Sequence, residues 1–301
     1  MEPRLAATPI TWGFVGNNRW GIDVPQERIL SEMAEIGFTA TEVGVLGFLP
    51  DDGTEAKVML DKYGLRAASG PVSFVIHERG SRADALESVR RAGERLVALG
   101  GDVLITVPKP GSLRPDESLG DDGWKELCDG LDAVEDLCHS MGLRQALHPH
   151  VGSLGETKED MQKVMEISSC GWCLDTAHIA SGDLDPSDFL EMAGDRIALV
   201  HIKDLKLDLG RKMVRHEIAF DAAIAARVFV PLGEGDLDLA GIIPLLPEEV
   251  WWVLEQDQAI AEIPESGTGP AADAASSLHV LQDLLGSADG EGNQGSVGLE
   301  C

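Results

Sequence analysis

The chain has 301 residues, of which 44% are hydrophobic and 25% charged, enough for one large soluble domain with a sizeable core. Its formal net charge of −28 repels phosphate backbones and anionic lipids, so neither nucleic-acid binding nor membrane binding is expected. No apolar run reaches the roughly 18 residues of a membrane helix, and residues 1–7 contain no apolar core of a secretory signal, so a cytoplasmic protein is expected.

Short apolar segments alternate with amphipathic helical segments along the chain, which is typical of a parallel sheet covered by helices. Several apolar segments are continuous, as expected for strands that are buried on both faces. The predicted strands are residues 9–13, 40–45, 66–72, 102–107, 144–148, 171–175, 197–202 and 251–255. Eight strands over about 250 residues predict an α/β fold, a single-domain (β/α)8 TIM barrel, over residues 1–285.

Capping residues mark where the predicted helices begin, and these are Asp23 ahead of Pro25, Ser81, Asp122, Thr157 and Asp185. Asp160 follows Thr157 with the spacing of a capping box. The stretch at about 205–232 is longer and less regular than a normal loop between strand and helix, and we expect it to cover the active site. Residues 286–301 are rich in Gly, Ser and acidic residues, which predicts a disordered tail.

The five cysteines do not suggest a disulfide framework, because their number is odd and no secretory signal precedes them. Cys170 and Cys173 have C-x-x-C spacing, but a structural zinc site would need a second pair. A redox pair would stand at a helix N-terminus, whereas this pair leads into an apolar strand. We therefore expect both side chains to pack in the core.

Polar residues gather at the carboxyl ends of the last four predicted strands, and these ends form the active-site face of a TIM barrel. The four strands end in His148-Pro-His150, Asp175-Thr-Ala-His178, His201-Ile-Lys203-Asp204 and Glu255-Gln256-Asp257. Each strand thus presents a His, Asp or Glu at a similar height. Imidazole nitrogen combined with carboxylate oxygen suits Mn, Co, Fe or Zn better than Ca, so the pattern predicts one divalent-metal site.

Several further polar residues could take part in the site. His148 and His150 are two positions apart on one strand and point the same way, so one could bind the metal and the other the substrate. Glu156, in the following loop, is a rival metal ligand or a general base. Besides His150, the candidates for substrate binding are Trp12 on the first predicted strand, Glu42 on the second and Lys109 after the fourth.

The segments Asp-Thr-Ala-His at 175–178 and His-Ile-Lys-Asp at 201–204 resemble the sugar phosphate isomerase/epimerase superfamily of xylose isomerase-like TIM barrels. Within it, His-Pro-His-Val-Gly-Ser at 148–153 and Glu-Gln-Asp at 255–257 are most similar to the myo-inosose-2 dehydratase branch. Further matching segments lie at 9–13, 37–44 and 231–235. The resemblance implies metal ligands at His148, Asp175, His201 and Glu255, and substrate-binding roles for His178 and Lys203.

The implied chemistry is proton transfer next to a carbonyl. A divalent metal polarises a ketone oxygen and stabilises the enediolate that forms when the α-proton is removed. His178 and Glu156 are the candidates for moving that proton, and Lys203 joins them as a catalytic candidate. Loss of a β-hydroxyl then gives dehydration, whereas return of the proton to the other face gives epimerisation.

The main hypothesis is therefore a metal-dependent dehydratase, a lyase of inositol catabolism, that acts on an inosose-like ketone with Mn or Co ahead of Fe or Zn. The alternative is a ketose 3-epimerase or aldose–ketose isomerase. A second alternative, a non-catalytic sugar-binding barrel or a subunit of a larger enzyme, fits the intact set of four ligands less well. The expected partner is a small polyol or keto sugar, and the sequence leaves open whether the chain forms a homo-oligomer.

Overall fold

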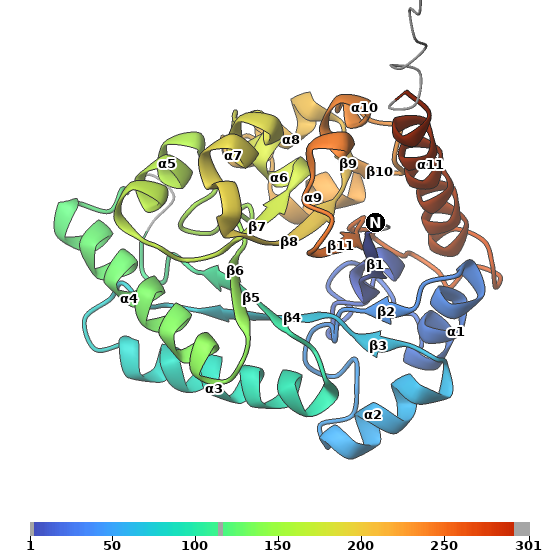
Figure 1. Ribbon diagram of the computed structural model, residues 1–301, viewed down its shortest axis with the longest axis horizontal. Helices are drawn as coiled ribbons and strands as arrows, with labels where there is room; N and C mark the ends of the chain where they lie inside the picture. Colours follow the sequence, from blue (N-terminus) through green and yellow to red (C-terminus); the bar gives the residue numbers. More distant parts are fainter. Residues whose placement is uncertain (1–2, 114–116, 292–301) are drawn as a thin grey trace, which may run out of the picture.

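The protein is described by a computed structural model over residues 3–113 and 117–291. Figure 1 shows strands at the centre and helices around their outside. All neighbouring strands of the nine-stranded sheet run parallel, in the order β3-β2-β1-β11-β8-β7-β6-β5-β4. The outermost two in this order, β3 (Arg66–Ala67) and β4 (Ser69–Phe74), are consecutive pieces of one strand, so the sheet closes on itself. The predicted single (β/α)8 barrel is confirmed.

The other barrel strands are β1 (Arg4–Ala7), β2 (Ala40–Thr41), β5 (Val103–Pro108), β6 (Arg144–Leu147), β7 (Trp172–Asp175), β8 (Ile197–Ile202) and β11 (Trp251–Leu254). Strands β5 and β8 are buried along their whole length, as the continuous apolar runs predicted. Apart from the first, every predicted strand overlaps an observed one.

The first predicted strand is wrong. Residues Pro9–Trp12 form the 3-10 helix η1, and the strand β1 lies five residues earlier, where it pairs with β11. Proline has no N–H for a sheet ladder, and its fixed φ suits the first turn of a helix. The strand is only four residues long and begins with Arg4, so its sequence did not stand out as apolar. In the structure, the guanidinium of Arg4 lies 3.9 Å from the centre of the Trp251 ring.

The outer layer consists of α1 (Gln26–Ile36), α2 (Gly53–Lys62), α3 (Arg82–Leu99), α4 (Asp121–Ser140), α5 (Lys158–Ile167), α7 (Pro186–Ala193), α10 (Leu239–Ile242) and α11 (Pro270–Glu291). The capping box of α5 is confirmed, because the hydroxyl of Thr157 accepts the N–H of Asp160 at 3.2 Å and the Asp160 carboxylate accepts the N–H of Thr157. Asp23 does not cap α1. Its carboxylate instead accepts backbone N–H groups of the loop before it, and Pro25 stands at the cap.

The predicted irregular stretch contains two helices and a small ladder. These are α8 (Leu207–Val214), α9 (Phe220–Ala225) and the antiparallel pair β9 (Asp204–Leu205) and β10 (Phe229–Val230). Their apolar side chains pack with Trp20 and Val151 from the loops after η1 and β6. At the end of the chain, α11 continues to Glu291, into the segment that the sequence predicted to be disordered, and residues 292–301 lie outside the described part.

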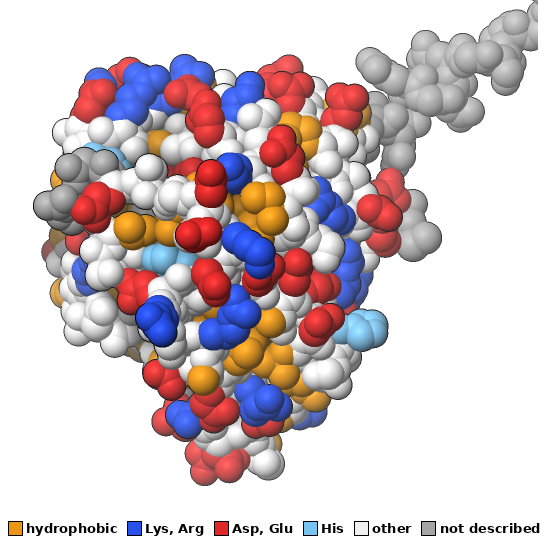
Figure 2. Space-filling view, turned by 90° about the vertical axis from the view of Figure 1, so that its left-hand side faces the viewer, with side chains coloured by type: hydrophobic (Ala, Val, Ile, Leu, Met, Phe, Trp, Pro, Cys, Tyr) orange, Lys and Arg blue, Asp and Glu red, His pale blue; other side chains and the backbone are white. Residues whose placement is uncertain are grey.

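Two apolar layers hold the barrel together. The inner one consists mainly of small and branched side chains of the strands, Cys173 among them, together with Trp251. The outer one joins the sheet to the helices and contains Cys170. Both cysteines are buried and free, as predicted, and Cys301 lies outside the described residues. Over residues 3–113 and 117–291, no helix is long and apolar enough to cross a bilayer. On the face in Figure 2, Lys and Arg side chains are interspersed with acidic ones.

Candidate active site

The candidate metal ligands continue the rows of side chains that point into the barrel. Side chains two positions apart on a strand face the same way. The inner apolar layer contains Ala146, Cys173, Leu199 and Val253. Two positions further on, at the carboxyl ends of four neighbouring strands, stand His148, Asp175, His201 and Glu255. Strand alternation and strand order therefore bring these four side chains together.

Three buried atoms of this set face one another without a hydrogen-bond partner: Oδ2 of Asp175, Nδ1 of His201 and Oε2 of Glu255. His201 Nδ1 lies 2.7 Å from Glu255 Oε2 and 3.5 Å from Asp175 Oδ2. His148 Nε2 lies 3.7 Å from the same Asp175 oxygen. Buried polar atoms without partners are costly, and a converging set of imidazole nitrogen and carboxylate oxygen is what a divalent transition metal would satisfy. The residues present fit such an ion.

Local structure explains the orientation of Asp175. The residue ends β7 and caps α6 (Thr176–Ser181), where its Oδ1 accepts the N–H groups of Ala177 and His178 at 3.0 and 2.8 Å. Thr176 next to it donates its hydroxyl to the carbonyl of Lys203 at 2.7 Å and ties α6 to the neighbouring strand. One carboxylate oxygen is thus held by the helix, and the other is left for the centre of the site.

Lys203 lies beneath the site rather than in contact with the cavity. Its side chain is 0% exposed, and its Nζ lies 2.8 Å from Glu255, 2.9 Å from Asp257 and 3.4 Å from Asp175. Burial disfavours the ammonium ion, but the three carboxylates outweigh it and hold the pKa of Lys203 well above its usual value. Lys203 therefore neutralises the carboxylates of the site, and its predicted catalytic or substrate-binding role is not supported by contact with the cavity.

The carboxylates respond differently to this cluster. Burial would raise the pKa of Glu255, but the positive charges of His201 and Lys203 hold it well below its usual range. Burial, reinforced by the charge of Glu255, raises the pKa of Asp257 to about 6 in spite of its contact with Lys203. Glu255 thus stays ionised, as a metal ligand must, while Asp257 can take up a proton near neutral pH.

A cavity of about 160 Å³ adjoins the ligand set. It is lined by Thr8, Ile10, Phe14, Glu42, Gly44, Val45, Pro71, Ser73, Ile105, Val107, Lys109, His148, His150, His201 and Glu255. Of the predicted substrate-binding residues, Glu42, Lys109 and His150 line this cavity. Trp12 does not: it is 1% exposed, and its indole N–H donates to the carboxylate of Glu32 on α1 at 2.8 Å. The turn of η1 directs this side chain into the core between the barrel and α1.

The two predicted proton-transfer residues do not line the cavity either. His178 is fully buried, its ring centre 4.5 Å from that of His150 and its Nε2 3.3 Å from Lys203 Nζ. Glu156 accepts the N–H of Gly152 at 2.6 Å, and burial raises its pKa. The sequence placed both near the strand ends, but it could not show which side chains reach the cavity.

The described residues 3–113 and 117–291 place two further titratable side chains in the cavity lining, in addition to Glu42 and the candidate ligands. These are Lys109 and His150. Burial, helped by the charge of Lys109, lowers the pKa of His150 to about 4, so this imidazole is neutral at pH 7. Its Nδ1 lies 2.6 Å from the carbonyl of Val151, which fixes the proton on Nδ1 and leaves the Nε2 lone pair free. Burial and the charge of Arg19 lower the pKa of Lys109.

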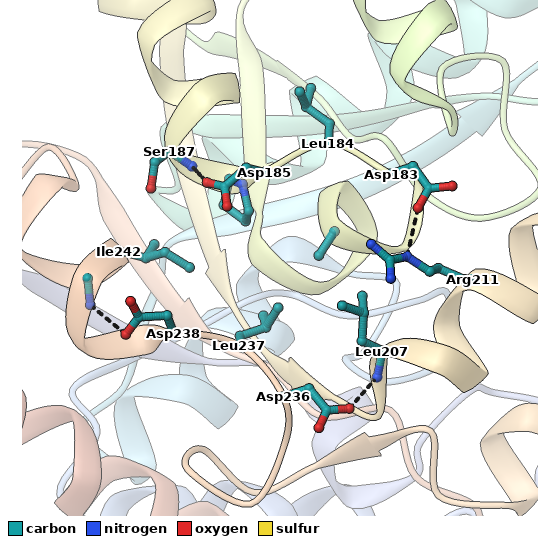
Figure 3. Close-up of a pocket in the computed structure, with 13 residues that line it drawn as sticks. Asp183, Leu184, Asp185, Ser187, Leu207, Arg211, Asp236, Leu237, Asp238 and Ile242 are labelled. Carbon is teal, nitrogen blue, oxygen red and sulfur yellow. Dashed lines mark hydrogen bonds and ion pairs between the residues drawn. The ribbon is translucent and has the colours of Figure 1, made fainter.

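A larger hollow, of about 400 Å³, lies outside the barrel between α7, α8 and the segment that leads into α10 (Figure 3). Its acidic groups already have partners: Asp183 pairs with Arg211 at 2.7 Å, Asp185 caps α7, and Asp236 accepts the N–H of Leu207 at 2.8 Å. None of the candidate site residues lines it, so the smaller cavity at the strand ends is the better active-site candidate.

The segment after β10 is held against Asp204, the last residue of the His-Ile-Lys-Asp segment at 201–204. The carboxylate of Asp204 accepts the N–H groups of Gly233, Gly235 and Leu237 at 2.9, 3.0 and 3.3 Å. A Cβ atom at Gly235 would collide with this carboxylate. Asp204, at the end of the His-Ile-Lys-Asp segment, therefore binds the backbone of the glycine-containing segment that begins at residue 231.

Comparison with known proteins agrees with this architecture. Residues 30–284 match the model of the family described as xylose isomerase-like TIM barrel. An inosose dehydratase of Geobacillus kaustophilus is 30% identical over 276 residues, covering 86% of this chain and 89% of that protein. The rhizopine catabolism protein MocC of Rhizobium meliloti is 29% identical, covering 86% of this chain and 82% of that protein.

Solved structures show the same fold at lower identity. An L-ribulose 3-epimerase superposes with a TM-score of 0.71 at 16% identity, with full coverage of both chains. The IOLI protein with a bound zinc atom superposes with a TM-score of 0.69 at 15% identity, covering 95% of this chain and 99% of that one. Because the family model matches residues 30–284 and the Geobacillus kaustophilus relative is 30% identical over most of both chains, the chain belongs to the xylose isomerase-like TIM barrel family.

Proposed function

We propose that this chain is a divalent-metal-dependent dehydratase, a carbon–oxygen lyase, that acts on an inosose-like polyhydroxylated ketone. The observation that carries the proposal is the set of three converging buried atoms on Asp175, His201 and Glu255 that make no hydrogen bond, beside the cavity at the strand ends. The relatives called inosose dehydratase, at 24–30% identity over most of the chain, supply the reaction class. The cavity of about 160 Å³ suits a compact ligand rather than a polymer.

We assign the metal to His148, Asp175, His201 and Glu255, with Mn or Co ahead of Fe or Zn. Bound there, the ion would act as a Lewis acid on the ketone oxygen and the neighbouring hydroxyl of the substrate. Lys203 would offset the negative charge of the two ligand carboxylates from below. Glu156 and Lys203 receive no chemical step in this proposal, because neither lines the cavity.

We assign proton transfer to His150 and Lys109, two titratable groups that line the cavity outside the ligand set, in place of His178 and Glu156. Neutral His150 would accept the α-proton on Nε2, and the electron pair of that C–H bond would form the new double bond. The β-hydroxyl would leave as water when the Lys109 ammonium protonates it, so that the C–O bond breaks. His178 packs against the ring of His150 and would act as a positioning residue.

A substrate screen tests this proposal. The purified protein would be incubated with inososes and with ketoses in D2O, and the products followed by NMR. The proposal predicts loss of water from an inosose. Epimerisation of a ketose without water loss would instead support the 3-epimerase alternative, and no reaction with either class would favour a non-catalytic sugar-binding barrel.

A further inference from the structure

The two ring nitrogens of His201 have different surroundings. Nδ1 faces Glu255 and Asp175, whereas Nε2 lies 3.0 Å from Oε1 of Glu42. Both His201 and Glu42 are buried, at 2% and 4% exposure, so water does not compete for this contact. Glu42 thus holds the nitrogen that points away from the other ligands.

Glu42 is itself fixed from three directions. Its N–H donates to the carbonyl of Ala7 on β1 at 2.9 Å, and the next N–H, of Val43, donates to the carbonyl of Ser69 on β4 at 2.8 Å. The hydroxyl of Ser69 donates to the same Oε1 that contacts His201, at 2.8 Å. The carboxylate is therefore held in place whether or not a ligand occupies the cavity.

We propose that Glu42 is a positioning residue for the metal-binding His201. Its carboxylate accepts the Nε2–H of His201, so that the Nδ1 lone pair of the ring faces the ion. This rests on the ligand set of the proposed function and replaces the predicted role of Glu42 in substrate binding. A histidine that binds a metal through one nitrogen commonly donates its other N–H to a carboxylate, which fixes the tautomer and the ring orientation. Glu42 and Ser69, on the far side of the ring from Asp175, supply that acceptor.

Glu42 could instead be a metal ligand. Ligand atoms of Glu42, His201 and Glu255 lie within 4.8 Å of one another, as do those of His148, Asp175 and His178. However, Glu42 contacts Nε2, and an ion bound to Nδ1 lies on the other side of the imidazole ring. With the ion on Nδ1, Glu42 could ligate only a second ion, which predicts two metal ions per chain. A single ion that Glu42 ligates would instead have to bind Nε2 of His201.

Metal affinity separates these roles without any substrate. Zinc affinity would be measured by chelator competition for wild type, Glu42→Ala and Glu42→Gln. Loss of an outer carboxylate partner typically weakens metal binding about 10–100-fold, and this is the loss expected for Glu42→Ala. Glu42→Gln keeps an acceptor oxygen and should recover most of the affinity, because the role needs an acceptor and not a ligand charge.

A matched pair of serines on β4 serves as the control. Ser69→Ala removes the hydroxyl that orients Glu42 and should weaken zinc binding, though less than Glu42→Ala does. Ser73→Ala removes a hydroxyl that lines the same cavity, and it should leave zinc affinity at the wild-type value. Thermal melts of each metal-free variant would show whether the chain is folded.

The ring tautomer gives the second readout. In the zinc-loaded, 15N-labelled protein, His201 should bind zinc through Nδ1 and carry a slowly exchanging proton on Nε2, and that proton should exchange fast in Glu42→Ala. The proposal would be overturned if zinc were bound through Nε2, or if Glu42→Ala kept wild-type zinc affinity. It would also be overturned if Glu42→Gln bound zinc as weakly as Glu42→Ala, or if wild type bound two zinc ions per chain and Glu42→Ala only one. Since no substrate is involved, an enzyme that proved to be an epimerase would leave these results unchanged.

Discussion

Replacing Lys203 by Met should destabilise the metal-free protein strongly. The lysine is fully buried, and its ammonium group is the shared partner of Asp175, Glu255 and Asp257 at 3.4, 2.8 and 2.9 Å. Methionine fills a similar volume, so the change mainly removes the positive charge. Three carboxylates then remain in a buried cluster in which the other cation is the imidazolium of His201. Burial lowers the pKa of His201, but the surrounding acids outweigh this effect and hold it well above its usual value.

The magnitude follows from the loss of one partner of a buried ion pair, which costs about 3–5 kcal/mol. For a domain of this length, 1 kcal/mol corresponds to about 2 °C, so the melting temperature should fall by about 6–10 °C. Asp257, with its pKa of about 6, can relieve part of this cost by taking up a proton, so the measurement belongs at pH 8. A bound divalent ion would also compensate the carboxylates, so the loss should shrink when metal is present.

The assay is thermal and urea unfolding in the presence of a chelator and again with added metal. Lys206→Met is the matched control: this lysine lies three residues further along the chain, its side chain is exposed, and its replacement should change stability by less than about 0.5 kcal/mol. If Lys203→Met melted like Lys206→Met in the chelator, Lys203 would not be the counter-ion of the site.

Three further predictions concern the site and its surroundings. Asp204→Ala leaves three backbone N–H groups of the 231–237 segment without their acceptor, so the free energy of unfolding measured in urea should fall by about 2–4 kcal/mol. A variant as stable as wild type would mean that water replaces the carboxylate. His150→Ala should slow solvent deuterium exchange at the substrate α-carbon by about 10²–10⁴-fold with the metal retained; a larger effect of His178→Ala would reverse the assignment. In a Cys301→Ser variant, the four buried cysteines, three of them with pKa values of about 11 to 12, should not react with DTNB until the chain is unfolded, and rapid reaction of the folded variant would contradict their burial.

The barrel and the convergence of the four candidate ligands could be predicted because both follow from short-range patterns. Continuous apolar runs mark buried parallel strands, and the residue that ends each strand must lie at the same edge of the sheet. Asp175, His201 and Glu255 come together for this reason, although the last two are far apart in sequence. The capping box at Thr157 could be predicted for a similar reason, since it involves only neighbouring residues.

The roles of single side chains could not be predicted, because they depend on direction and on distant partners. Trp12 stands in a matching segment, yet the turn of η1 points it at Glu32 instead of the cavity. Lys203 follows His201 by two positions and shares its direction, but only the positions of Glu255 and Asp257 show that it is enclosed by acids. Neither contact has a signature within a few residues of sequence.

The central claim is that activity on an inosose requires one divalent ion held by the four strand-end ligands. Protein stripped with a chelator would be titrated with Mn, Co, Fe or Zn, and dehydration of the inosose followed by NMR at each ratio of metal to chain. The account predicts no dehydration without metal and full activity near one equivalent, with His201→Ala requiring far more metal. Full activity in the metal-free protein would contradict it.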